Sequence, residues 1–261
     1  MDSSSRRRSS GVLLFAAFLV TSALPVPMDV ALRESLCVLA VVILVASAVV
    51  ADARVVVAGV FCAVAVVSTR FNPWQFWPTA LLVPLVGWGL IAVVVPALRR
   101  AVVISVGKRP DRVTAWFMAL TVVVSGIALV VWHELARPDL GDLLAMIPVM
   151  PALLLPLACL GFAIVNAIIE ELIWRGIIWE MLAGSIGSTA LIIVLQAVSF
   201  GLFHIHGFPR GVIGVVMASV YGVALGWIRH RTGGLGAVIV THVFADIVIF
   251  VVLISLTPSA S

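Results

Sequence analysis

The stretch LACLGFAIVNAIIEELIWRGII, residues 157–178, places two adjacent carboxylates, Glu170 and Glu171, inside an otherwise apolar run. On insertion scales each charge at mid-bilayer costs about 2.5–3.5 kcal/mol, hence about 5–7 kcal/mol for the pair. Neighbouring Leu, Ile, Val and Phe side chains return only about 0.3–0.6 kcal/mol apiece. Insertion is tolerable at this cost, but packing does not require the pair. We therefore expect the functional site here.

The composition of the whole chain indicates an integral membrane protein. Hydrophobic residues make up 63% of the sequence, charged residues 11%, and the mean hydropathy is +1.25. Such a chain cannot present a polar surface to water on all sides. We expect an all-α, polytopic transmembrane helical bundle with eight or nine membrane segments. Apolar runs of spanning or near-spanning length lie at about 11–27, 36–51, 55–69, 78–98, 113–132, 143–169, 188–205, 211–228 and 235–256.

The basic residues between these runs predict the orientation. In a nine-span arrangement twelve fall on one side (Arg6, Arg7, Arg8, Arg54, Arg99, Arg100, Lys108, Arg109, Arg112, Arg175, Arg229 and Arg231) and four on the other (Arg33, Arg70, Arg137 and Arg210). Because cytoplasmic loops are rich in Lys and Arg, the N-terminus is expected in the cytoplasm. The preference for Arg over Lys is typical of GC-rich bacterial genomes, which favours the bacterial cytoplasmic membrane.

The formal net charge of +4 fits this topology and contact with anionic membrane lipid. No basic stripe interleaved with aromatic residues occurs outside the apolar runs, so nucleic acid is not an expected partner.

Two parts of the chain differ in where their polar residues lie. Residues 1–142 place no ionisable residue deep in a span and are expected to serve packing or substrate access. Residues 143–261 hold the intramembrane polar groups and are expected to form the catalytic core. Pro148, Pro151 and Pro156 predict a kinked or partly re-entrant stretch at 143–156, which is tolerated only inside protein or beside a wet cavity.

Helix periodicity assigns the carboxylates different roles. Glu171 and Arg175 are four residues apart, share a helix face and can pair, whereas Glu170 points about 100° away and stays available. His242 and Asp246 share a face in the same way. Asp246 is therefore expected to hold the tautomer of the imidazole or to add a second polar group to the same cavity.

The spacing along the chain brings Glu170 and His204 to one depth. They are 34 residues apart, and the turn-like residues 184–188 lie midway, about 25 Å from each on antiparallel helices. His242 fits less well, because it follows the loop at 233–234 by only about nine residues. In straight helices it would lie about 12 Å shallower, unless a kink, a sunken loop or a tall cavity closes the difference.

Three motifs on successive C-terminal spans carry a family resemblance. Glu170-Glu171-x-x-x-Arg175, Phe200-x-x-x-His204 and His242-x-x-x-Asp246 resemble the motifs of the CPBP family, the type II CAAX prenyl endopeptidases and bacteriocin-processing or Abi-type membrane proteins. Residues 226–235, GWIRHRTGGL, are also similar to the sequence before the family's third motif. The resemblance covers about residues 160–250. One departure is Asp246, because the CAAX-processing enzymes often have Asn at this position.

The resemblance implies peptide-bond hydrolysis inside or at the rim of the membrane, acting on a peptide or a lipidated, possibly prenylated, protein. The implied catalytic residues are Glu170, Glu171, Arg175, His204, His242 and Asp246. In this interpretation Glu170 acts as general base toward a water that His204 also contacts. His242 and Asp246 then polarise the scissile carbonyl or stabilise its oxyanion.

Metal-dependent hydrolysis is the alternative mechanism. A divalent ion such as zinc would be held by Glu170, His204 and His242 and would itself activate the water. We favour activation by side chains without a cofactor, since the chain has no HExxH-type pair of ligands.

Two other functions stay open at this stage. A proton-coupled transporter also places Glu and His at mid-membrane, but it usually shows internal repeats, and the two halves of this chain are dissimilar. A non-catalytic bacteriocin-immunity or membrane adaptor protein is the other alternative, because the Abi-type relatives could keep the motifs by descent.

Overall fold

The computed structural model describes residues 3–24, 30–50, 52–71, 79–94, 105–147 and 150–256, and all regular structure in these ranges is helical. The bundle is built from α1 (Ser3–Ala23), α2 (Val30–Val50), α3 (Ala53–Phe71), α4 (Thr79–Val94), α6 (Arg112–Ala136), α8 (Leu155–Glu171), α9 (Trp179–Ser185), α10 (Thr189–Phe203), α11 (Gly211–Thr232) and α12 (Gly236–Ser255), with the short α7 (Gly141–Leu144) between α6 and α8. The predicted all-α class is confirmed.

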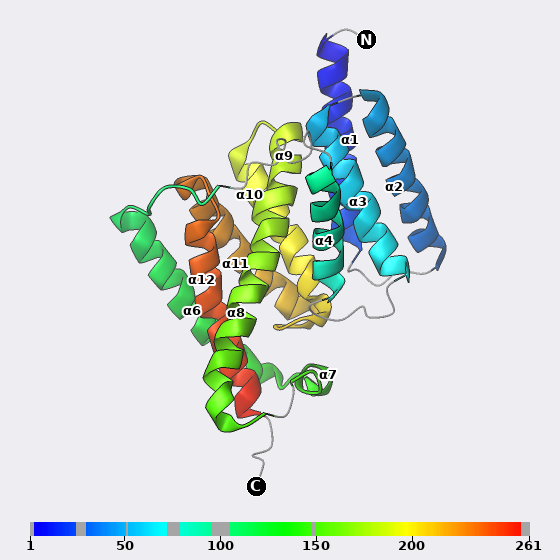
Figure 1. The fold of residues 1–261 in the computed structure, drawn as a ribbon. Coiled ribbons are helices and arrows are strands. Elements are labelled where there is room, and N and C mark those ends of the chain that lie inside the picture. The colour runs from blue at the N-terminus through cyan, green and yellow to red at the C-terminus, as the bar shows by residue number, and fades with distance from the viewer. Residues whose placement is uncertain are drawn as a thin grey trace.

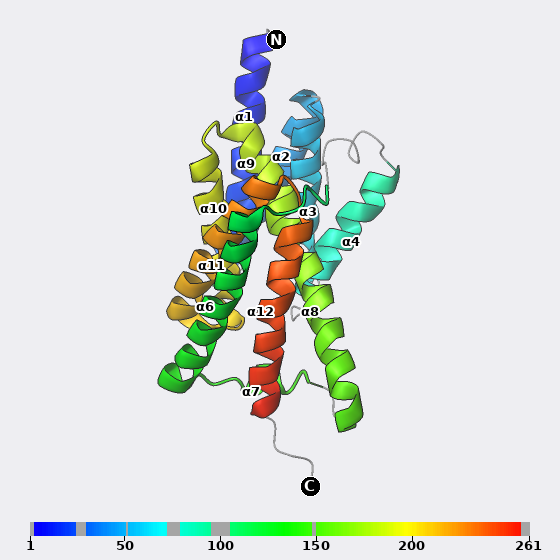
Figure 2. The same cartoon turned by 90° about the vertical axis from the view of Figure 1, so that its left-hand side faces the viewer.

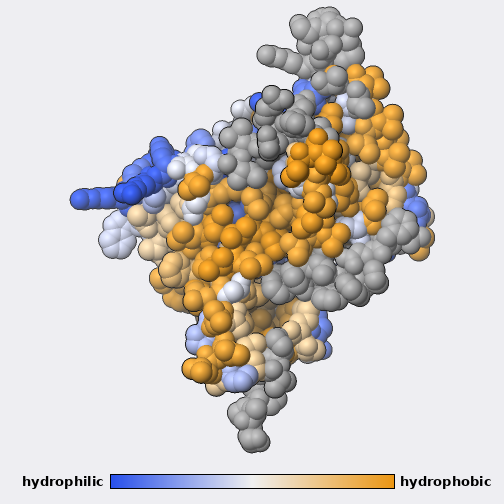
Figure 3. All heavy atoms as spheres, viewed as in Figure 1, coloured by the Kyte–Doolittle hydropathy of each residue, from blue (hydrophilic) through white to orange (hydrophobic). Residues whose placement is uncertain are grey.

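Six helical stretches in the described ranges are long and apolar enough to cross a membrane, and three shorter apolar helices accompany them. They lie side by side along one axis, with the start of α1 and the end of α12 at opposite ends (Figure 1, Figure 2). Hydrophobic side chains spread across the middle of the face in Figure 3, and hydrophilic ones gather beside the start of α6. This is the surface of an integral membrane protein.

The span that carries the two glutamates differs from the prediction. One continuous helical stretch covers Ala152–Ser185, so the predicted span at 143–169 is wrong. Within it, α8 passes into a π-helical segment, Leu172–Ile178 (η2), and then into α9. Arg175, assigned above to a connection, is fully buried in this segment. The helix can continue past the charges because Arg175 pairs with a glutamate inside the protein.

The stretch before α8 is irregular, as the prolines predict. After α7 the chain turns, and Pro151 precedes a single 3₁₀ turn, Ala152–Leu154 (η1), that leads into α8. Pro156 occupies the first turn of α8, where its missing N–H leaves no hydrogen bond unmade. Pro148 lies outside the described residues.

One hydrophobic core joins the N-terminal helices to the C-terminal ones. Its buried members include Leu14 of α1, Phe61 of α3, Ile177 of the π-helical segment, Leu182 of α9 and Phe200 of α10. The assignment of residues 1–142 and 143–261 to different roles stays a prediction. The packing nevertheless gives the N-terminal helices a direct contact with the elements that carry the motifs.

Candidate active site

A buried ion pair anchors the site at the junction between α8 and the π-helical segment. Arg175 Nη1 donates to Glu171 Oε1 at 2.9 Å, and both side chains are fully buried. Arg175 Nη2 donates to the carbonyl of Gly222 on α11, and the guanidinium lies over the ring of Phe200 on α10, 4.4 Å from its centroid. The pairing predicted from the spacing of four is confirmed, and it ties three elements together.

The same glutamate holds His242 of α12. His242 Nδ1 lies 2.6 Å from Glu171 Oε1. Because a carboxylate accepts, Nδ1 carries a proton and Nε2 is directed to the other side of the ring. Of the two roles expected of Asp246, fixing this tautomer falls to Glu171 of a neighbouring helix, whereas Asp246 adds a second polar group to the same cavity, as the other alternative predicts. Glu171 thus contacts both Arg175 and His242.

Two carboxylate oxygens lie near the opposite nitrogen of His242. Glu170 Oε2 is 3.6 Å and Asp246 Oδ1 is 3.7 Å from His242 Nε2. Neither oxygen has a hydrogen-bond partner among the described residues, although both are buried. A buried oxygen without a partner carries an uncompensated desolvation cost, which is typical of groups with a functional role. Glu170 takes no part in the ion pair between Glu171 and Arg175, as helix periodicity predicts.

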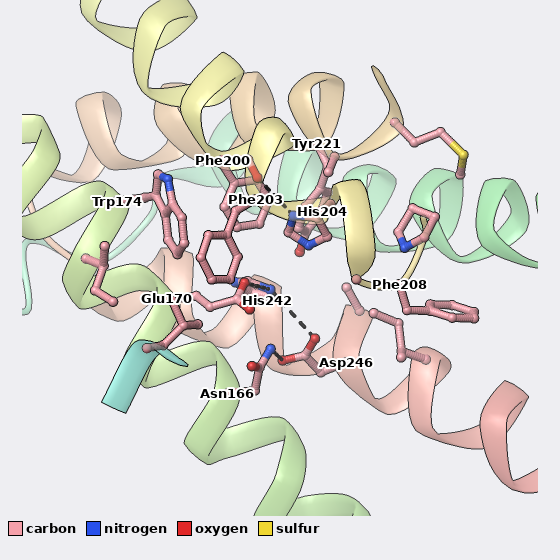
Figure 4. Close-up of a pocket in the computed structure, with 18 of the residues that line it drawn as sticks. Asn166, Glu170, Trp174, Phe200, Phe203, His204, Phe208, Tyr221, His242 and Asp246 are labelled. Atoms are coloured by element: carbon pink, nitrogen blue, oxygen red, sulfur yellow. Dashed lines mark hydrogen bonds and ion pairs between the residues drawn. The ribbon is translucent and has the colours of Figure 1, made fainter. Parts of the chain in front are cut away.

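Asn166 is a residue of this cluster that the motifs do not include. It lies one turn before Glu170 on α8 and is buried, and its Nδ2 donates to Asp246 Oδ2 at 3.1 Å. This bond occupies one oxygen of Asp246 and leaves Oδ1 toward His242 (Figure 4). A signal was present in the sequence, because Asn166 is a polar residue in an apolar run, four positions before Glu170.

His204 faces the same cavity from the end of α10. Its Nδ1 lies 2.9 Å from the carbonyl oxygen of Phe200, so Nδ1 donates and the neutral ring keeps its lone pair on Nε2. Its ring packs against that of Phe200 with centroids 4.6 Å apart. Glu170 and His204 line one cavity, as their equal spacing from the turn at 184–188 predicts (Figure 4).

Aromatic side chains form the wall beside Glu170 and His204. Trp174 packs edge-on against Phe200 and Phe203, with centroids 5.3 Å and 5.1 Å away. Its indole N–H donates to Ser199 Oγ, which also accepts a hydrogen bond from Ser22 of α1. The first helix of the chain is therefore part of the wall of the site.

The position of α12 explains why His242 reaches the glutamates. α12 begins lower along the bundle axis than the connection between α9 and α10, in both views (Figure 1, Figure 2). The turn at 233–235 that precedes it is thus set into the bundle. This position corresponds to the sunken loop among the explanations left open above.

The cavity has a volume of about 1240 Å³ and is lined by residues of both the N-terminal and the C-terminal helices. Near one end, Arg210 makes a two-pronged bridge to Asp142 of α7, with N–O distances of 2.8 and 2.9 Å. Hydrogen bonds from Arg210 hold the pKa of Asp142 below its usual range. The bridge fixes α7 to the segment after His204, and both line the cavity.

Among the described residues, no three His, Cys, Asp or Glu side chains are arranged to hold a metal ion, and this applies to Glu170, His204 and His242. The choice between water activated by side chains and water activated by a metal stays a prediction.

The buried cluster of carboxylates, histidines and one arginine inside a membrane bundle defines a membrane protein with an enzyme-like site. Residues 151–248 match the sequence model of a family described as "Type II CAAX prenyl endopeptidase Rce1-like". This segment is a domain of the Rce1-like type II CAAX prenyl endopeptidase (CPBP) family, which implies a membrane peptidase with a peptide substrate. Neither a curated protein nor a solved structure matches the chain.

Proposed function

We propose that this protein is an intramembrane endopeptidase that hydrolyses a peptide bond of a membrane-associated substrate through a water activated by Glu170 and His204. The observation that carries the proposal is the separation of 3.6 Å between Glu170 Oε2 and His242 Nε2 in the cavity, with the glutamate oxygen lacking a hydrogen-bond partner among the described residues. Atoms at this separation can both contact one water or one substrate oxygen.

The proposed reaction uses the two glutamates differently. Glu170 takes a proton from the attacking water, whose oxygen bonds to the carbonyl carbon, and returns that proton to the amine as the C–N bond breaks. Glu171, bonded to Arg175, holds His242 at Nδ1 so that Nε2, when protonated, donates to the developing oxyanion. His204 orients the water through its Nε2 lone pair.

The cavity supports an apolar substrate. Its volume of about 1240 Å³ is above the range of about 300–1,000 Å³ typical of small-molecule pockets, and Phe61, Phe117 and Phe162 are among its lining residues. An extended peptide with an apolar or lipidated residue fits these dimensions and this chemistry. We propose such a substrate and leave both prenylated and unmodified forms as candidates.

We also propose nine membrane passages, with the start of α1 on the cytoplasmic side of a bacterial cytoplasmic membrane. Six long and three shorter apolar helices in the described ranges, together with the start of α1 and the end of α12 at opposite ends of the bundle, support an odd number of passages. The excess of Lys and Arg in the connections at the α1 end supports the orientation.

The experiment that tests the proposed activity uses the full chain purified in detergent or reconstituted in liposomes. A library of peptides, each with and without a prenyl group, is incubated with the wild-type protein, and new termini are identified by mass spectrometry. We expect cleavage by the wild-type protein. Cleavage of no member by well-folded protein would favour the non-catalytic adaptor instead.

A further inference from the structure

A cluster of exposed cations lies outside the site, where the chain enters α6. Lys108, Arg109 and Arg112 are exposed, and none forms an ion pair within the described ranges. We call these three residues the basic rim. Figure 3 shows hydrophilic side chains projecting from the bundle in this region.

The segment that carries the basic rim is fixed against the turn before α12. Lys108 N–H donates to the carbonyl of Thr232, and the N–H groups of Leu235 and Gly236 donate to residues 105 and 106. Gly107 has a φ of +82°, and a Cβ on it would lie 2.6 Å from the backbone nitrogen of Gly234. Glycine is therefore required at this contact, and the cations are presented on a rigid backbone.

Asp111, which lies between Arg109 and Arg112 in the sequence, does not neutralise the basic rim. Asp111 Oδ1 accepts from the backbone N–H of Thr114, and Asp111 Oδ2 accepts from Arg231 at 2.7 Å. The hydrogen bond from Thr114 and the charge of Arg231 hold the pKa of Asp111 below its usual range. Asp111 thus stays ionised and engaged with Arg231, and the three rim cations keep their charge unbalanced.

An apolar stripe continues from the basic rim along α6. Trp116, Val123 and Ile127 are 77%, 56% and 60% exposed. Helix periodicity places them within about 60° of Arg112 on one face. Trp116 is one turn from Arg112, the position at which an indole sits between headgroups and acyl chains. Cations, tryptophan and aliphatic side chains follow one another along α6 in the same order as the phosphate, the interfacial region and the acyl chains of a phospholipid.

We infer that the basic rim and this stripe form a binding site for an anionic phospholipid, with the headgroup phosphate on Lys108, Arg109 and Arg112 and an acyl chain along Trp116, Val123 and Ile127. The occupant is a lipid and not free phosphate, because the stripe adds an apolar contact that an inorganic anion cannot use. The site is separate from the Glu170 cavity and does not depend on the proposed hydrolysis.

The test measures which lipids contact the full-length protein in a bilayer. The wild-type protein is reconstituted in phosphatidylcholine with trace spin-labelled phosphatidylglycerol or phosphatidylcholine, and the motionally restricted fraction is read by electron paramagnetic resonance. We expect a selectivity of about fivefold for phosphatidylglycerol at low salt, as for one effective cation contact, falling as salt is added. Equal restriction of both lipids by the wild-type protein at low salt would overturn the inference without any variant.

A charge-matched comparison locates the site. Lys108→Gln/Arg109→Gln/Arg112→Gln should lose the selectivity, whereas Arg33→Gln/Arg54→Gln/Arg137→Gln, which removes three exposed cations elsewhere, should keep it. Equal loss in both variants would refute a local site. Inorganic phosphate should reduce the selectivity no more than sodium chloride of the same ionic strength. Stronger competition by phosphate would overturn the inference and identify a free-anion site. Release of the lipid by an acidic peptide at that ionic strength would overturn it and identify a protein-docking surface.

Discussion

Replacing Arg175 with methionine should destabilise the protein strongly, because it leaves the buried carboxylate of Glu171 without its cation. Removing one partner of a buried pair costs about 3–5 kcal/mol. Two features place the loss of unfolding free energy at about 3 kcal/mol, the low end of that range. His242 still donates to Glu171 Oε1, and the carbonyl of Gly222 keeps its hydrogen bond from Gln196. Methionine fills most of the volume, so the loss comes mainly from charge.

The assay is reversible unfolding of the purified protein in mixed micelles, with folded fraction followed by tryptophan fluorescence. The matched control is Arg231→Met, which breaks an exposed pair with Asp111 and should cost less than about 1 kcal/mol. The double variant Glu171→Leu/Arg175→Met should lose about 1–3 kcal/mol less unfolding free energy than the sum of the losses in the two single variants. Additive effects, or a loss in Arg175→Met no larger than in the control, would refute the buried pair as the anchor of the site.

Three further predictions concern Asn166, the Asp142–Arg210 bridge and the dependence of cleavage on metal. Asn166→Ala should keep the fold but reduce turnover by about 10–100-fold, because Asp246 loses the hydrogen bond that positions it. Asp246→Asn should be tolerated, and the exchanged pair Asn166→Asp/Asp246→Asn should recover most of the turnover that Asn166→Ala loses. Equal turnover in wild type and Asn166→Ala would count against the role of this bond. The Asp142–Arg210 bridge should stabilise the protein above pH about 4 and stop doing so as the pH falls through the lowered folded-state pKa of Asp142. Thermal unfolding of wild type and Asp142→Asn should therefore differ slightly at pH 6 and coincide in strong acid, and a difference that grows in acid would contradict this reasoning. Chelators should leave peptide cleavage largely intact if side chains alone activate the water, and cleavage lost on chelation and regained with zinc would establish the metal-dependent alternative.

Local spacing was sufficient for the parts of the site that lie on one helix. The pairing of Glu171 with Arg175, and the direction of Glu170 away from this pair, follow from 3.6 residues per turn. The contact of Glu171 with His242 joins residues 71 positions apart. It depends on how far α12 is set into the bundle, and no periodicity in the chain specifies that depth.

The wrong span boundary has a related cause. The apolar run ends near residue 169, where Glu170 and Glu171 begin, yet the buried pair compensates these charges and the helix runs to Ser185. Asn166 was missed because a single polar residue in an apolar run is usually a packing residue. Its role became visible only when α12 brought Asp246 beside it.

Cleavage by Glu170→Gln tests the central claim most directly. The substitution keeps the size and hydrogen-bonding capacity of the side chain but removes the carboxylate proposed to take a proton from water. The protein is assayed in liposomes on a peptide that the wild-type protein cleaves, beside Glu134→Gln as a control at an exposed glutamate outside the cavity. We expect Glu170→Gln to unfold at the wild-type temperature and to lose cleavage by at least about 100-fold, with the control unchanged. Wild-type cleavage rates in folded Glu170→Gln would contradict the account.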